Sequence, residues 1–143
     1  MMNLQTQEMD LSCINLQMLR ASHRVMKIYE DAYRPYGVKA TQMPVLNLIE
    51  QLKTMTTREI AEKTESERSV LSRKLSVMEK NGWIMAETDS QTREKVFQLT
   101  DAGKQLLNEI KPVRLQVQEK LLAQFDENEI NLLMNLCDKF HEK

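Results

Sequence analysis

Small hydroxyl side chains and basic side chains recur between residues 67 and 80 at a spacing that places them together on a helix. On a helical wheel of 100° per residue they share a face without an acidic residue. This face comprises Ser69, Ser72, Arg73, Ser76 and Lys80. Short hydroxyls let a helix approach the floor of a DNA major groove, and an arginine fork can pair with guanine O6 and N7. An ordinary solvated face would look the same, so on this helix alone both interpretations stay open.

A second group of basic residues lies in the segment "WIMAETDSQTREKVFQLT" (83–100), which has the pattern of a β-hairpin. Phe97 and Leu99 alternate with Gln98, so one face of the second strand packs inward. The polar tip exposes Arg93 and Lys95. An arginine there can follow the DNA backbone or enter a narrow minor groove, where negative potential is concentrated.

The alternative for Arg93 is an ion pair with Asp89 or Glu94, and an acidic neighbour could also orient an arginine that reaches DNA. The hairpin follows the hydroxyl-bearing helix directly, and this favours a DNA-binding role for both. We also include Arg68, at the start of that helix. The candidate DNA contacts are therefore Arg68, Ser69, Ser72, Arg73, Ser76, Lys80, Arg93 and Lys95.

These side chains need a scaffold, and apolar residues at helical spacing predict most of it. A long helix is expected over 11–33. A second is expected over 41–52 with Thr41 as its N-cap, because Pro44 is tolerated only in the first turn. Residues 53–56 resemble a short strand.

A short helix over 56–64 should begin with a capping box of Thr56 and Glu59, and Gly82 should end the helix over 67–80. Leu71, Leu75 and Met78 form the apolar stripe of that second helix. Thr100 or Asp101 should cap a long helix over 102–124, which Pro112 should kink. Asp126 and Glu129 form a capping box for the last helix.

Two short helices followed by a hairpin have the layout of a winged helix-turn-helix. The expected fold is mainly α with a small β-hairpin wing, in which long dimerisation helices flank the winged helix-turn-helix core. Residues 1–40 would hold the N-terminal dimerisation helix, 41–100 the DNA-binding region and 101–143 the C-terminal dimerisation helices, in one compact domain. The flanking helices are too long and too apolar to be satisfied in a monomer.

Composition excludes several classes of protein. The 143 residues carry a net charge of −1, so DNA binding must come from local placement and not from a basic chain. We expect no enzyme, because a Gly-rich phosphate loop, a nucleophile–base pair and paired carboxylates are lacking. No metal or cofactor is expected either, since the two cysteines and two histidines are far apart.

The two cysteines also indicate a reducing compartment. The cysteine spacing is not that of a secreted disulfide framework, and the start "MMNLQTQEMD" is not that of a signal peptide. No apolar run approaches the roughly 18 residues of a membrane span. We therefore expect a cytoplasmic protein that does not contact a membrane.

With these motifs in order, the sequence resembles MarR-family transcriptional regulators over nearly its whole length. The resemblance rests on "YGVKATQMPVL", "TTREIAEKTESERSVLSRKLSVMEKNGWI", "DSQTREKVFQLTDAG" and "FDENEINLLMNL". It implies a bacterial repressor that binds a pseudo-palindromic DNA duplex as a homodimer and is released by a small-molecule effector or an oxidant.

Two features depart from the family pattern. Thr64-Glu65-Ser66 stands where the turn of the helix-turn-helix usually holds a glycine, so the turn is either looser or hydrogen-bonded by these side chains. The wing is one residue short, and Gln91 replaces an acidic residue two positions before Arg93. Arg93 would then be held less rigidly.

Two alternatives to a ligand-released repressor remain. One is a peroxide-sensing regulator acting through Cys13. An inert buried or interfacial thiol is favoured, because a reactive thiol needs a cationic neighbour and the nearest basic residue in the sequence is Arg20. The other is a winged-helix module that binds proteins. Such a module would have no reason to keep the face around Ser72 and Arg73 small, hydroxylic and free of acid.

Overall fold

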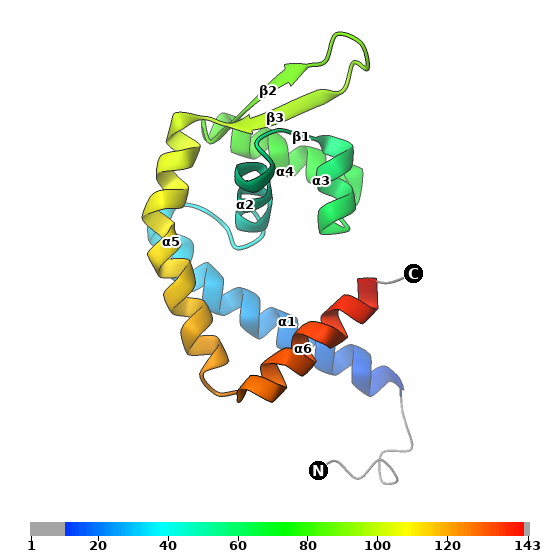
Figure 1. The fold of residues 1–143 in the computed structure, drawn as a ribbon, viewed down its shortest axis with the longest axis vertical. Helices are drawn as coiled ribbons and strands as arrows, with labels where there is room; N and C mark the ends of the chain where they lie inside the picture. Colours follow the sequence, from blue (N-terminus) through cyan, green and yellow to red (C-terminus); the bar gives the residue numbers. More distant parts are fainter. Residues whose placement is uncertain (1–10, 142–143) are drawn as a thin grey trace.

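The computed structural model describes residues 11–141, as helices below and a small sheet above (Figure 1). It confirms a mainly α fold with a small β-hairpin wing. The elements in chain order are α1 (Leu11–Tyr33), the 3-10 turn η1 (Arg34–Tyr36), α2 (Met43–Leu52), β1 (Met55–Thr56), α3 (Thr57–Thr64), α4 (Arg68–Lys80), β2 (Ile84–Thr88), β3 (Lys95–Leu99), α5 (Asp101–Leu122) and α6 (Glu127–His141).

The upper part of the molecule is a winged helix-turn-helix whose core lies between its helices and the sheet. The strands run β1-β3-β2, and both pairings are antiparallel. Phe97 of β3 faces Met55 on one side and Ala86 on the other. The predicted stripe of Leu71, Leu75 and Met78 is completely buried, and each such side chain stabilises the fold by roughly 1.5–3 kcal/mol.

Local hydrogen bonds explain where three helices begin. Thr56 Oγ1 accepts from the backbone N–H of Glu59 at 3.1 Å, but the Glu59 carboxylate accepts from the Thr56 hydroxyl and not from its N–H, so this capping box is only half formed. Thr100 caps α5 by accepting from the Gly103 N–H at 3.0 Å. Asp126 and Glu129 exchange both bonds of their capping box, at 2.8 and 3.1 Å.

The prediction that Thr41 caps α2 is wrong. The helix begins at Met43, and Thr41 lies exposed in a turn before it. Two side chains hold the turn: Glu30, ten positions earlier in α1, accepts from the Ala40 N–H at 2.8 Å, and the buried Gln42 side chain accepts from the Lys39 N–H at 2.8 Å. Pro44 still falls in the first turn, as its missing N–H requires.

The turn between α3 and α4 is hydrogen-bonded by its own side chains, which decides between the two interpretations of Thr64-Glu65-Ser66. The Thr64 hydroxyl lies 2.7 Å from the Ile60 carbonyl and 2.8 Å from the Ser66 hydroxyl. Glu65 takes the left-handed conformation, with φ of 52°, that a glycine would adopt more easily. Its carboxylate lies 2.7 Å from Nδ1 of His141, at the end of α6.

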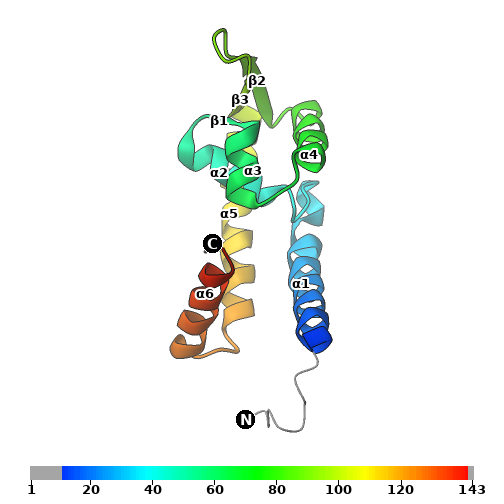
Figure 2. The ribbon, with the colours of Figure 1, turned by 90° about the vertical axis from the view of Figure 1, so that its right-hand side faces the viewer.

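The helices below this region expose many apolar side chains. On α1 these include Ile14, Leu16 and Met18, and α6 has no buried residue at all. Helix α5 continues without interruption through Pro112. In Figure 1 α6 overlaps α1, but the view turned by 90° shows the two helices standing apart (Figure 2). These apolar faces are therefore not covered by each other within one chain.

Candidate nucleic-acid interface

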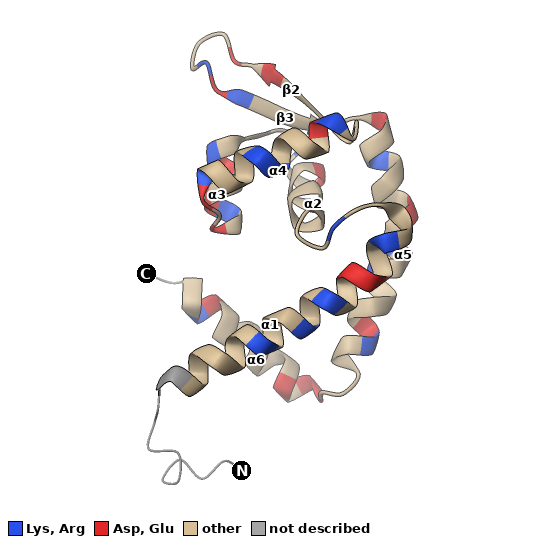
Figure 3. Ribbon diagram, turned by 180° about the vertical axis from the view of Figure 1, so that it is seen from behind, with Lys and Arg blue, Asp and Glu red and all other residues tan. Residues whose placement is uncertain are grey.

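Helix α4 presents its predicted contact residues to solvent, next to the hairpin. Arg68, Ser69, Ser72, Arg73, Ser76 and Lys80 are all exposed. Figure 3 shows α4 across the outer side of the upper region, with basic residues along it and acid only near its C-terminal end, where Glu79 lies. The face predicted from the wheel is therefore an accessible surface.

The first turn of α4 is basic. Glu67 precedes the helix without capping it through its side chain, and the first turn holds Arg68 but no acidic residue. A helix N-terminus already bears a partial positive charge, so an arginine there costs some helix stability and strengthens the attraction for an anion such as phosphate. Arg68 lies about 100° from the centre of the hydroxyl face, so it would contact DNA from the flank.

Three predicted residues, two from α4 and one from β3, come together in a notch between α4 and the sheet. Ser72 and Ser76 of α4 and Lys95 of β3 line a cavity of about 180 Å³. Thr57, the first residue of α3, lines it too and was missed in the sequence, because no local pattern places α3 opposite β3. Two serines, a threonine and a lysine supply donors for a phosphate oxygen, although Glu79 at the same notch opposes an anion.

Asp89 organises the tip of the hairpin. Its carboxylate accepts from the backbone N–H groups of Gln91 and Thr92, at 2.8 and 3.0 Å, and the bond from Thr92 is the main cause that lowers the pKa of Asp89 below 3.8. The backbones of Asp89 and Glu94 pair above the strands, and the Arg93 N–H donates to the Asp89 carbonyl at 2.9 Å. Arg93 takes a left-handed φ of 61°. The turn thus fixes the backbone at Arg93, while a less rigidly held Arg93 side chain, with Gln91 in place of an acid, stays a prediction.

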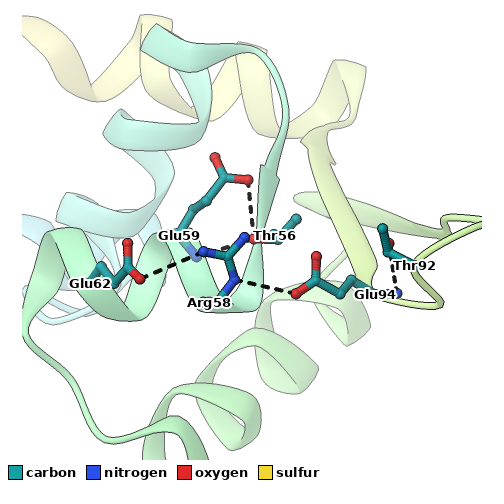
Figure 4. A network of polar contacts seen from close by, with 6 residues as sticks. All are labelled: Thr56, Arg58, Glu59, Glu62, Thr92 and Glu94. Atoms are coloured by element: carbon teal, nitrogen blue, oxygen red, sulfur yellow. Dashed lines mark hydrogen bonds and ion pairs between the residues drawn. The ribbon is translucent and has the colours of Figure 1, made fainter.

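The Arg93 side chain is exposed and, among residues 11–141, forms no ion pair with Asp89 or Glu94. Glu94 instead meets Arg58 of α3, whose Nε lies 3.4 Å from its carboxylate (Figure 4). Arg58 also reaches Glu62 at 3.7 Å. Half-exposed pairs like these contribute at most about 1 kcal/mol. Their effect here is to neutralise an acid beside the wing tip and leave Arg93 available.

Sequence analysis did not identify Arg58. The two partners are 36 positions apart, and only the packing of α3 beside β3 brings them together. The residue types did not indicate this pair either, because Glu62, one turn from Arg58, makes Arg58 look like part of an ordinary helical ion pair.

Other chemistry finds little support in residues 11–141. They contain no group of three His, Cys, Asp or Glu side chains able to hold a metal ion, and none of their helices is long and apolar enough to cross a membrane. Cys13 is exposed, so the expectation of a buried thiol is wrong, while the interfacial alternative stays a prediction.

Comparison with known proteins agrees with this geometry. A family model described as the MarR family matches residues 36–93, which run from η1 to the wing tip. An uncharacterised HTH-type transcriptional regulator, YwoH of Bacillus subtilis (strain 168), is 26% identical over 124 residues, covering 87% of this chain and 90% of the relative. A similar regulator of Bacillus cereus is 27% identical over 92% of this chain and 88% of its own length.

Solved structures share the fold. A variant of MarR from E. coli complexed with operator DNA superimposes with a TM-score of 0.81 at 18% identity, over 94% of this chain and 96% of that chain. The M. tuberculosis regulator MOSR, in complex with DNA, has a TM-score of 0.75 at 28% identity, over 85% and 90% of the two chains. Family model, relatives and fold agree: the MarR family model matches the DNA-binding region, and over most of its length the chain is similar to winged helix-turn-helix transcriptional regulators.

Proposed function

We propose that this regulator is a repressor that binds a pseudo-palindromic DNA duplex as a homodimer and is released by a small ligand. Its curated relatives are named transcriptional regulators, and the same role, not that of an enzyme, is proposed for this chain. The observation that carries the proposal is the exposed hydroxyl and basic face of α4 directly beside a hairpin whose tip exposes Arg93, which has no ion pair within the described residues 11–141. That two structural neighbours are complexes with DNA supports it.

In this proposal α4 lies in the major groove. Ser69 and Arg73 on its exposed face would contact base edges, while Ser72, Ser76 and Lys95 would hold a phosphate at the notch. The N-terminus of α4, with Arg68, would face the DNA strand that carries this phosphate.

Arg93 at the wing tip would enter the adjacent minor groove or follow its backbone. The left-handed backbone at this residue directs the chain through the tip, and the bonds to Asp89 fix it before DNA arrives. An ordered tip loses little conformational entropy on binding, so more of the attraction between guanidinium and phosphate contributes to affinity.

The second copy of the chain would cover the exposed apolar faces of α1 and α6. Leu132 and Phe140 on α6 are 58% and 65% exposed, and such a face is unfavourable in water. We expect a dimer interface above about 2,000 Å² in total, the size of an obligate interface. Light scattering should give twice the chain mass at micromolar concentration, and a monomer would contradict this architecture.

A cavity of about 220 Å³ between α1, α2 and α5 is the proposed effector site. The Tyr29 and Tyr33 rings, 5.7 Å apart, and Arg114 line it. Burial, and secondarily Tyr29, raises the pKa of Tyr33 to about 12, so this phenol is neutral and can donate a hydrogen bond. These groups fit a small aromatic carboxylate. Benzoate should displace DNA from the parent and less so from Arg114→Ala.

The relatives are Bacillus proteins, so we place the regulator in a bacterial cytoplasm, where DNA is accessible. The decisive experiment is selection from a random duplex pool by the purified protein. A two-fold symmetric consensus should emerge, with half-sites about one helical turn apart. Recovery of random sequences would refute the proposal and favour a protein-interaction module. Peroxide treatment separates the two modes of release. A ligand-released repressor should retain DNA after the treatment. A sensor acting through Cys13 should lose DNA in the parent but retain it in Cys13→Ser.

A further inference from the structure

Helix α4 has a second apolar stripe, on the side that faces solvent. Val70 and Val77 are 43% and 46% exposed, although the buried stripe of the same helix is complete without them. They are seven residues apart, so they lie on one line along the helix, two turns from each other. At 100° per residue this line runs about 40–60° from Arg73, along the exposed flank of the face proposed to enter the groove and on the side opposite to Arg68.

These valines contribute little to the stability of the folded chain. Valine is a weaker helix former than alanine because its branched side chain loses rotamer freedom, and half-exposed methyl groups recover little hydrophobic stabilisation. Most other exposed large apolar residues lie on α1, α5 and α6, where a second copy can cover them. Between β1 and β3 the exposed set in the described chain is Val70, Val77 and Met85.

We propose that Val70 and Val77 select thymines by packing on their C5-methyl groups; this rests on the proposed insertion of α4 in the major groove. The thymine methyl is the apolar group that a base pair shows in that groove, and a valine offers no donor or acceptor to any other base edge. Cytosine places only hydrogen at the same position. The valines therefore favour T over C without a hydrogen bond.

The two valines address different base pairs. Seven residues of α-helix rise about 10.5 Å, which corresponds to about three base-pair steps of 3.4 Å. Arg73 lies between them along the helix, one turn from each. A half-site read by this face would carry thymines on either side of the position that Arg73 contacts.

The test removes the methyl group and nothing else. In the best duplex from the random-pool selection, each thymine is replaced in turn by deoxyuridine, and dissociation constants are measured by fluorescence anisotropy. The parent should bind about four-fold more weakly where a valine contact is lost, the factor expected for one buried methyl group. Val70→Ala should abolish the methyl effect at one thymine, and Val77→Ala at another.

Met85→Ala is the matched control, since it removes an equally exposed apolar side chain outside α4 and should keep the parent's pattern. Circular dichroism verifies that all variants are folded. Equal binding of the parent to every deoxyuridine duplex, valine variants that keep its pattern, or a selected half-site without thymine would overturn the inference. In each case the selected consensus would still stand, so DNA binding itself is tested separately.

Discussion

Replacing Gly103 by alanine should destabilise the protein, although alanine is normally the better helix residue. Gly103 lies in the first turn of α5, where that helix leaves the wing. A Cβ at this position would lie 2.1 Å from the carbonyl oxygen of Trp83 and 3.3 Å from Cδ2 of Leu99. The Trp83 oxygen is backbone, so it cannot rotate away as a side chain would.

The magnitude follows from what must move. Restoring an ordinary contact requires α5 and the chain before β2 to separate by more than 1 Å, an overpacking that costs about 1–3 kcal/mol. The same movement stretches the 3.0 Å bond from the Thr100 N–H to the Trp83 oxygen, which is worth about 0.5–1.5 kcal/mol. Alanine recovers up to about 1 kcal/mol through helix propensity. The net loss of unfolding free energy should therefore be about 0.5–4.5 kcal/mol, with a middle value of about 2.5 kcal/mol.

Urea unfolding measures this, and Trp83 is the single tryptophan, so its fluorescence reports from the site itself. Protein concentration must be the same throughout, because dimerisation adds to apparent stability. Lys104→Ala, on the next, exposed residue of α5, is the control and should change stability by less than about 0.5 kcal/mol. A Gly103→Ala protein as stable as the parent would refute the close approach of α5 to Trp83.

Three further predictions concern the interface. Arg73→Ala should weaken binding to the selected site by ~1–3 kcal/mol and relax preference at one base pair; an equal loss for all sequences would make Arg73 a phosphate contact. Arg93→Ala should make the negative slope of log affinity against log salt less steep by about 1 and leave half-site preference unchanged. An unaltered slope would count against a wing contact. The folded pKa of Asp89 is lowered, so its stabilisation of the wing is present above pH 3.8 and is lost as the pH falls through the folded pKa. The NMR shifts of the Gln91 and Thr92 amides should therefore titrate below pH 3.8. A midpoint at or above pH 3.8 would contradict the turn.

Features that depend on neighbours in the chain could be predicted from the sequence. Thr100 caps α5 through a residue three positions on, and Asp126 and Glu129 bond within one turn. The period of Leu71, Leu75 and Met78 identified the buried side of α4, and therefore its exposed side.

Features that depend on distant groups were missed or misplaced. The start of α2 was misplaced because Glu30 of the preceding helix, ten positions before Ala40, holds the turn. The pair of Arg58 with Glu94 spans the packing of α3 on β3, so no spacing predicts it.

The sequence by itself predicted the resemblance to the MarR family, the order of the helices and the hairpin, and the exposed hydroxyl and basic face of α4, because motifs, capping and periodicity act over a few residues. Only the tertiary structure decided which acid Arg58 neutralises, which residues share the notch with Lys95, and why residue 103 has no side chain. Each of these depends on a contact between segments far apart in the chain, whose geometry is set by packing of the common core and not by any local pattern.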